Sequence, residues 1–155
     1  MSKTEPLPFE LSHHVRDTCL CLHAQRTARA LARRFDDVFR PLDLTSGQFS
    51  LLASLNRAEP PSIGPVAALL GMDRTTLTAA LKPLERRGLI KVIVDTNDRR
   101  SRRLKLTAKG RTLLVRAIPL WEKAHSAIEL DLSGIDPELL RHGLRVLSAP
   151  EAAKA

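Results

Sequence analysis

The 155-residue sequence is poor in aromatic residues and in cysteine. Phe and Trp make up 3% of the chain and Tyr is absent, so a core has to be built mainly from Leu, Ala, Val and Ile. Only two cysteines occur, Cys19 and Cys21, which argues against a disulfide-stapled secreted framework. No apolar run approaches the ~20 residues that cross a bilayer, and the first ten residues lack the apolar stretch of a secretion signal. We therefore expect a cytoplasmic protein with no membrane partner.

Acidic residues are scarce in one segment of the chain. Between Lys82 and Arg116 there are twelve Lys/Arg and three Asp/Glu, a net charge of +9, whereas the whole chain carries +8. The remainder is therefore close to neutral, and the positive charge is concentrated in one place. This distribution indicates a polyanionic partner rather than general solubility.

The spacing of apolar residues predicts helices on both sides of a β-hairpin. Caps are expected from Thr45 with Gln48, from Ser62, from Asp73 and from Thr107. The predicted helices span about 11–40, 49–55, 66–70, 74–87, 107–132 and 139–147. A short helix, a turn at Gly71 and a longer helix together predict a helix-turn-helix.

The hairpin is predicted from two runs of strand-forming residues. An apolar β-branched run over 89–94 is followed by the basic tip Asp98-Arg99-Arg100 and by an alternating strand that ends at Leu106. A cationic hairpin beside a helix-turn-helix is typical of proteins that hold duplex DNA. The fold class is therefore mainly α with a small β-hairpin wing.

Four motifs at fixed spacing identify a resemblance. They are Leu42-x-Leu44-Thr45, Leu81-x-x-Leu84-Glu85-x-x-Gly88-Leu89-Ile90, Asp98-Arg99-Arg100 and Leu106-Thr107-x-x-Gly110. Together they resemble the MarR family of winged helix-turn-helix transcriptional regulators. The resemblance implies a homodimer that binds a pseudo-palindromic operator in double-stranded DNA. Such a dimer is usually a repressor that a small ligand, often an aromatic or other anion, releases.

The chain divides into three predicted parts. Residues 1–41 form an N-terminal dimerisation helix, 42–106 the winged helix-turn-helix DNA-binding domain, and 107–155 the C-terminal dimerisation helices. The apolar stripes of the flanking helices exceed what the central part can cover. A two-fold homodimer is the simplest way to bury them.

The DNA-binding surface is predicted from the predicted helix 74–87. When its apolar residues face the core, its polar residues form the exposed face. By the resemblance, Arg100 enters the minor groove. Phosphate repels a carboxylate, so we expect Asp98 to orient Arg100 or the turn of the wing rather than to contact DNA. Arg103 and Lys105 alternate outward from Leu104 and Leu106, and we expect them at phosphates. The predicted contacts are Arg74, Thr75, Thr76, Thr78, Lys82, Arg99, Arg100, Arg103 and Lys105.

Cys21 supports an alternative, because it falls where the peroxide-sensing branch of the family carries its reactive cysteine. Gln25 and Phe35 stand where that branch has tyrosines, and a buried, inert thiol is the other interpretation. On a continuous helix, Cys19 and Cys21 would point about 200° apart and could not pair. A metal site at Cys19 and His23 is not expected.

Two other classes of function fit the sequence less well than DNA binding does. A winged-helix module that binds protein or RNA would present Leu or aromatic side chains on its recognition helix, whereas this chain presents Arg, Thr and Lys. An enzyme is not expected, because the sequence has no nucleophile–base motif, glycine-rich phosphate loop or cofactor motif. Trp121 is interpreted as core or dimer packing, or alternatively as part of an effector pocket.

Overall fold

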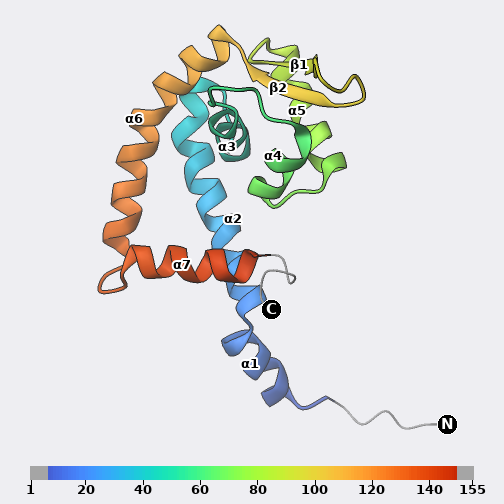
Figure 1. Cartoon of the computed structure of the whole chain (residues 1–155). Helices are drawn as coiled ribbons and strands as arrows, with labels where there is room; N and C mark the ends of the chain where they lie inside the picture. The colour runs from blue at the N-terminus through green and yellow to red at the C-terminus, as the bar shows by residue number, and fades with distance from the viewer. Residues whose placement is uncertain (1–6, 150–155) are drawn as a thin grey trace, which may run out of the picture.

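The computed structural model describes residues 7–149, which form helices and a single two-stranded hairpin that projects at one edge (Figure 1). The elements are α1 (Phe9–Thr18), α2 (Leu20–Phe39), the 3-10 turn η1 (Arg40–Leu42), α3 (Ser46–Ser54), α4 (Ile63–Leu70), α5 (Arg74–Arg86), β1 (Ile90–Val94), β2 (Arg102–Leu106), α6 (Ala108–Asp131) and α7 (Pro137–Ser148). The predicted fold, mainly α with a β-hairpin wing, is confirmed. The outer ends of the predicted parts 1–41 and 107–155 lie outside the described residues.

The first predicted helix is wrong in its continuity. Cys19 has an extended backbone, with φ −72° and ψ 106°, and separates α1 from α2. Its Sγ accepts a hydrogen bond from the Leu22 amide at 3.4 Å, so Cys19 caps α2 instead of continuing α1. Helix α1 buries none of its residues and has no packing to keep it in line with α2. The angle predicted between Cys19 and Cys21 on a continuous helix therefore does not apply.

The core lies mainly in the central part of the chain, and the long helices α2 and α6 also contribute residues to it. Leu52 on α3, Leu77 and Leu84 on α5, and Leu104 on β2 are fully buried. Helix α2 contributes its last residue, Phe39, whose ring stacks on Phe49 of α3 at 4.5 Å between centroids. Helix α6 contributes Leu114 and Ala117. The winged region (residues 42–106) and the long helices α2 and α6 thus share one core.

Most of the predicted helix caps are present. Thr45 and Gln48 form the reciprocal capping box of α3, with hydrogen bonds of 3.2 and 3.1 Å. Asp73 caps α5, and the Thr107 hydroxyl accepts from the Gly110 amide at the start of α6. Ser62 precedes α4, but its side chain makes no capping hydrogen bond, and that prediction is wrong. The helices α5 and α6 continue through Pro83 and Pro119 respectively.

Two glycines explain the motifs that flank the hairpin. Gly88 has φ +70° and ends α5, with the Leu89 amide donating to the Leu84 carbonyl at 3.0 Å. A Cβ on Gly110 would lie 2.1 Å from the Leu89 carbonyl oxygen, so only glycine permits this approach of α6 to the chain entering β1. The Leu-Thr-x-x-Gly motif therefore docks α6 onto the base of the wing.

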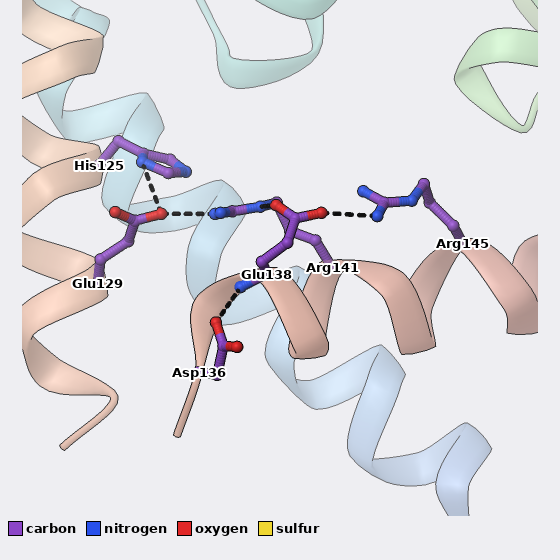
Figure 2. Close-up of polar contacts among 6 residues, drawn as sticks. All are labelled: His125, Glu129, Asp136, Glu138, Arg141 and Arg145. Carbon is purple, nitrogen blue, oxygen red and sulfur yellow. Dashed lines mark hydrogen bonds and ion pairs between the residues drawn. The ribbon is translucent and has the colours of Figure 1, made fainter. Parts of the chain in front are cut away.

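Helix α7 is attached to α6 by a charged cluster (Figure 2). Glu129 on α6 accepts a hydrogen bond from Arg141 at 2.5 Å, and Nδ1 of His125 lies 3.6 Å from the same carboxylate. Glu138 accepts from Arg141 at 3.0 Å and from Arg145 at 2.7 Å. Hydrogen bonds from Arg145 and then Arg141 hold the pKa of Glu138 below its usual range. The charged face of α7 is thereby occupied within the chain.

None of the helices within residues 7–149 combines the length and apolarity needed to cross a membrane.

Candidate nucleic-acid interface

Helix α5 divides into a buried face and an exposed face. Leu77, Leu81 and Leu84 point into the core. The other side forms a shallow hollow of about 310 Å³, lined by Arg74, Thr75, Thr78, Ala79 and Lys82. Four predicted contact residues therefore share one surface. The hollow contains two cations and no carboxylate, which suits a polyanion.

The hydroxyl groups at the start of α5 are not equivalent. Asp73 accepts hydrogen bonds from both the amide and the hydroxyl of Thr76, each at 2.7 Å, and these bonds hold the pKa of Asp73 below its usual range. The Thr78 hydroxyl donates to the Arg74 carbonyl at 2.7 Å. A hydroxyl has only one proton to donate, so Thr76 and Thr78 have used theirs within the helix. No hydrogen bond joins the Thr75 hydroxyl to another described residue, which leaves its proton for a ligand.

Arginines project from a turn that Asp98 shapes at the wing tip. One carboxylate oxygen of Asp98 accepts from the Arg100 amide at 2.9 Å, and its carbonyl accepts from the Ser101 amide at 2.9 Å. Asp98 therefore stabilises the turn at the wing tip, and its orienting role toward DNA stays a prediction. The side chains of Arg99 and Arg100 are exposed at this tip.

Arg103 does not project outward as predicted. Its Nε donates to the Asp95 carboxylate at 2.5 Å, and its Nη1 donates to the Pro60 carbonyl at 3.0 Å. Alternation along β2 does place Arg103 on the face opposite the core, together with Ile93 of β1. The loop before α4 runs beside β2, however, and its Pro60 carbonyl, together with Asp95, gives the guanidinium partners within the chain.

Asp95 is a residue that the sequence did not single out. It is 7% exposed and follows β1, where its carboxylate accepts from the Asn97 amide at 2.8 Å as well as from Arg103. The hydrogen bond from Asn97, followed by that from Arg103, holds the pKa of Asp95 below its usual range. The signal in the sequence was a carboxylate directly after an apolar strand, within the most basic segment of the chain.

Lys105 lies at the base of the wing rather than near its tip. It is opposite Lys91 in the strand register, and both side chains are exposed. Lys105 also borders a hollow of about 170 Å³, together with Arg57 and Arg111. Like charges directly opposite one another destabilise a strand pair. An anion bound at this end of the hairpin would relieve that repulsion.

Cys21 is exposed near the start of α2, so the interpretation of a buried thiol is wrong. Its sulfur accepts a hydrogen bond from the Gln25 amide nitrogen at 3.1 Å. Phe35 lies fourteen residues further along, about 21 Å at the α-helical rise, and stacks on Phe39. Within residues 7–149, no three His, Cys, Asp or Glu side chains are grouped as a metal site would require.

Trp121 packs between the winged region and the end of α6. Its ring stacks on Phe49 of α3 at 6.4 Å and lies 4.8 Å from the imidazole of His125. These contacts support the packing interpretation of Trp121.

Comparison with known proteins decides the family. Residues 44–101 match the MarR family. The HTH-type transcriptional regulator YybA of Bacillus subtilis is 36% identical over 115 residues, which cover 72% of each chain. This chain belongs to the MarR family. The predicted family is thus confirmed, and with it a DNA-binding transcriptional regulator rather than an enzyme.

Solved structures of family members show the same fold. The Mycobacterium tuberculosis regulator MosR, in complex with DNA, has a TM-score of 0.75 and 37% identity, and the match covers 88% of this chain and 96% of MosR. The repressor CouR bound to a 23-mer DNA duplex has a TM-score of 0.75 and 31% identity, over 94% of this chain and 100% of CouR. A structure of CouR from Rhodococcus jostii RHA1 contains p-coumaroyl-CoA.

Proposed function

We propose that this MarR-family chain is a homodimeric repressor that binds a pseudo-palindromic operator and is released by a small aromatic or anionic effector. The observation that carries the proposal is the carboxylate-free hollow on α5, with an arginine-tipped hairpin in the same domain. Two such domains would place two copies of α5 in successive major grooves, ~34–36 Å apart, with the wings in the flanking minor grooves.

Exposed apolar residues on the terminal helices support the homodimer. Neither α1 nor α7 buries a residue, and isolated helices of this length are marginal in water. Figure 1 shows α1 extending away from the rest of the chain. The large exposed apolar residues on and beside these helices are Leu7, Phe9, Leu11, Val15, Ile135, Leu139, Leu140, Leu144, Val146 and Leu147. A second copy of the chain would cover them.

The roles of the predicted contact residues follow from their surroundings. Arg74, Thr75 and Lys82 have side chains available for phosphates and base edges on α5. Arg99 and Arg100 at the tip are suited to the minor groove, where the negative potential is strong. Lys105, together with Lys91, would hold a phosphate at the base of the wing. Thr76 and Thr78 would shape the N-terminal turn of α5.

Release by an effector is supported by the way the two halves of the chain are joined. The stack that runs from His125 through Trp121 and Phe49 to Phe39 connects the end of α6 to the core of the winged region. A ligand that shifts α6 against α3 would change the distance between the two copies of α5. Because both half-sites must be bound in register, a small change in that distance weakens binding strongly.

The proposal is tested by titrating the protein against the DNA upstream of its gene at increasing salt. An inverted repeat there should bind, and its log–log salt slope should be about −5 or steeper if six phosphates are contacted. Removing one half-site should reduce the affinity sharply. Salt-independent binding, or equal affinity for both duplexes, would contradict the proposal.

The exposed thiol of Cys21 favours a second candidate, release by peroxide. Oxidation to a sulfenic acid would occur on the exposed part of α2, beside Gln25. Peroxide should then release DNA from the wild-type protein but not from the Cys21→Ser variant. Wild-type protein that holds its operator in peroxide would eliminate this candidate.

A further inference from the structure

We propose that Arg103 is a positioning residue, which with Asp95 fixes the wing against the start of α4, and that it contacts no phosphate. The proposal rests on the DNA-binding function proposed above and divides its cationic residues into two classes. Arg99 and Arg100 contact the nucleic acid, whereas Arg103 sets the place from which they do so.

The partners of Arg103 come from both sides of the joint between wing and helix-turn-helix. Asp95 belongs to the outgoing arm of the hairpin, and Pro60 belongs to the loop that leads into α4. The same loop makes an isolated β-bridge between Ser62 and Arg103, and the Leu104 amide donates to the Pro61 carbonyl at 2.8 Å. Strand β2 is therefore tied to the first helix of the helix-turn-helix by backbone and side chain together.

The two guanidinium nitrogens of Arg103 that donate to Asp95 and to the Pro60 carbonyl could bind phosphate only if this joint opened. A phosphate bound at Nε would displace Asp95, whose side chain is almost completely buried and would then lose its cationic partner. The neighbouring Arg102 differs, because its side chain is exposed and donates only to the carbonyls of Arg99 and Ser101 among the described residues. Cations that are adjacent in sequence thus have different surroundings.

Asp95 also connects this joint to the wing tip. Its carboxylate accepts from the Asn97 amide, and its own amide donates to the Ser101 carbonyl at 3.1 Å. The turn at Asp98 lies between these two points. Because the Arg103 guanidinium is a planar fork, it can bind Asp95 and Pro60 at once, which an ammonium cannot do in the same geometry. Loss of either partner should let the tip arginines move relative to α5.

The Asp95→Asn variant gives the sharpest test, because the two possible roles of Arg103 predict opposite changes in operator affinity. If Arg103 positions the wing, Asp95→Asn should weaken operator binding by about tenfold, similar to the loss of one arginine contact. If Arg103 binds phosphate, the same change removes a competing carboxylate near the DNA and should tighten binding. Affinity is measured by fluorescence anisotropy, at a temperature well below the thermal midpoint of each variant.

The salt slope provides a second readout that a loss of folding stability would not move. Arg103→Gln should weaken binding by about tenfold with an unchanged slope, whereas Arg100→Gln should reduce the magnitude of the slope by about 0.9. Arg103→Lys keeps the charge but not the fork, so it should bind as weakly as Arg103→Gln. The double variant Asp95→Asn/Arg103→Gln should be no weaker than either single variant, because both disrupt the same joint.

Three results would overturn the inference: tighter binding by Asp95→Asn, a slope reduced by about 0.9 in Arg103→Gln, or full affinity in Arg103→Lys. Wild-type protein that binds no duplex would instead overturn the proposed function itself. If Asp95→Asn proves unfolded, Arg103→Lys decides between the two roles on its own, since a phosphate contact predicts wild-type binding for it.

Discussion

The winged region and the terminal helices differ in how their structure is stabilised. In the winged region, Leu52, Leu77 and Leu104 are fully buried within the same chain. In α1 and α7 no residue is buried, and Phe9 remains 80% exposed. The first region buries its apolar residues within one copy, whereas the second leaves apolar surface exposed, which in our proposal a second copy covers. The winged region is therefore stabilised by contacts within one chain, whereas the proposed dimer depends on the exposed residues of α1 and α7.

The largest expected loss of stability comes from adding a side chain where α6 packs against the base of the wing. Gly110→Ala would place a Cβ against the Leu89 carbonyl and should lower the free energy of unfolding by about 3 kcal/mol. Urea denaturation followed by circular dichroism measures this. Gly47→Ala on α3 is the matched control, because a Cβ there meets no atom within 4 Å. Equal stabilities for the two variants would contradict the packing described.

A substitution in the terminal helices should weaken dimerisation rather than folding. Leu144→Asp places a carboxylate on the exposed apolar face of α7 and should weaken dimerisation by about 2 kcal/mol or more, leaving the winged region folded. Sedimentation velocity measures the shift toward monomer. Leu69→Asp is the control, since Leu69 is an exposed apolar residue on α4 in the winged region. If both variants dissociate alike, the proposed division between the two regions is incorrect.

A smaller effect is expected from removing one DNA contact. Arg100→Ala should weaken operator binding by about 1–2 kcal/mol and leave the thermal midpoint unchanged, because its side chain is exposed at the wing tip. The matched cation is Lys123 on α6, exposed but distant in sequence from the winged region. Lys123→Ala should bind almost as the wild type does. A dissociation constant unaffected by Arg100→Ala would remove this residue from the interface.

The smallest expected effect is a dependence of stability on acid. The pKa of Asp95 is lowered in the folded protein, so its contribution is fully present above the unfolded value of about 4 and is lost as pH falls through the folded value. Asp73 and Glu138 shift in the same direction. The thermal midpoint should therefore decrease as the pH is lowered below about 4. This decrease should be less steep for the Asp95→Asn variant than for the wild type. Parallel curves for the two proteins would show that Asp95 contributes nothing.

Local signals in the sequence predicted the winged region well. The capping box at Thr45, the cap at Asp73 and the glycine at 88 each act within a few residues, so they could be recognised without tertiary information. The turn at Asp98 is held by equally local hydrogen bonds. Sequence patterns of this kind are sufficient because the interactions they describe are short in range.

Predictions failed where the deciding contact came from a distant segment. Arg103 looked like an outward cation because alternation along a strand says nothing about the loop at Pro60 that covers it. The break at Cys19 was missed because apolar spacing continues across it, whereas the backbone there is extended. Asp95 was missed because its partner is eight residues away across the hairpin.

The central claim is that two copies of this chain present α5 and the wing to one duplex at the same time. Measuring the mass of the complex on a duplex with a single inverted repeat, by sedimentation or light scattering, tests it directly. We expect two chains on each duplex and no stable complex with one chain. A one-to-one complex of full affinity would contradict it.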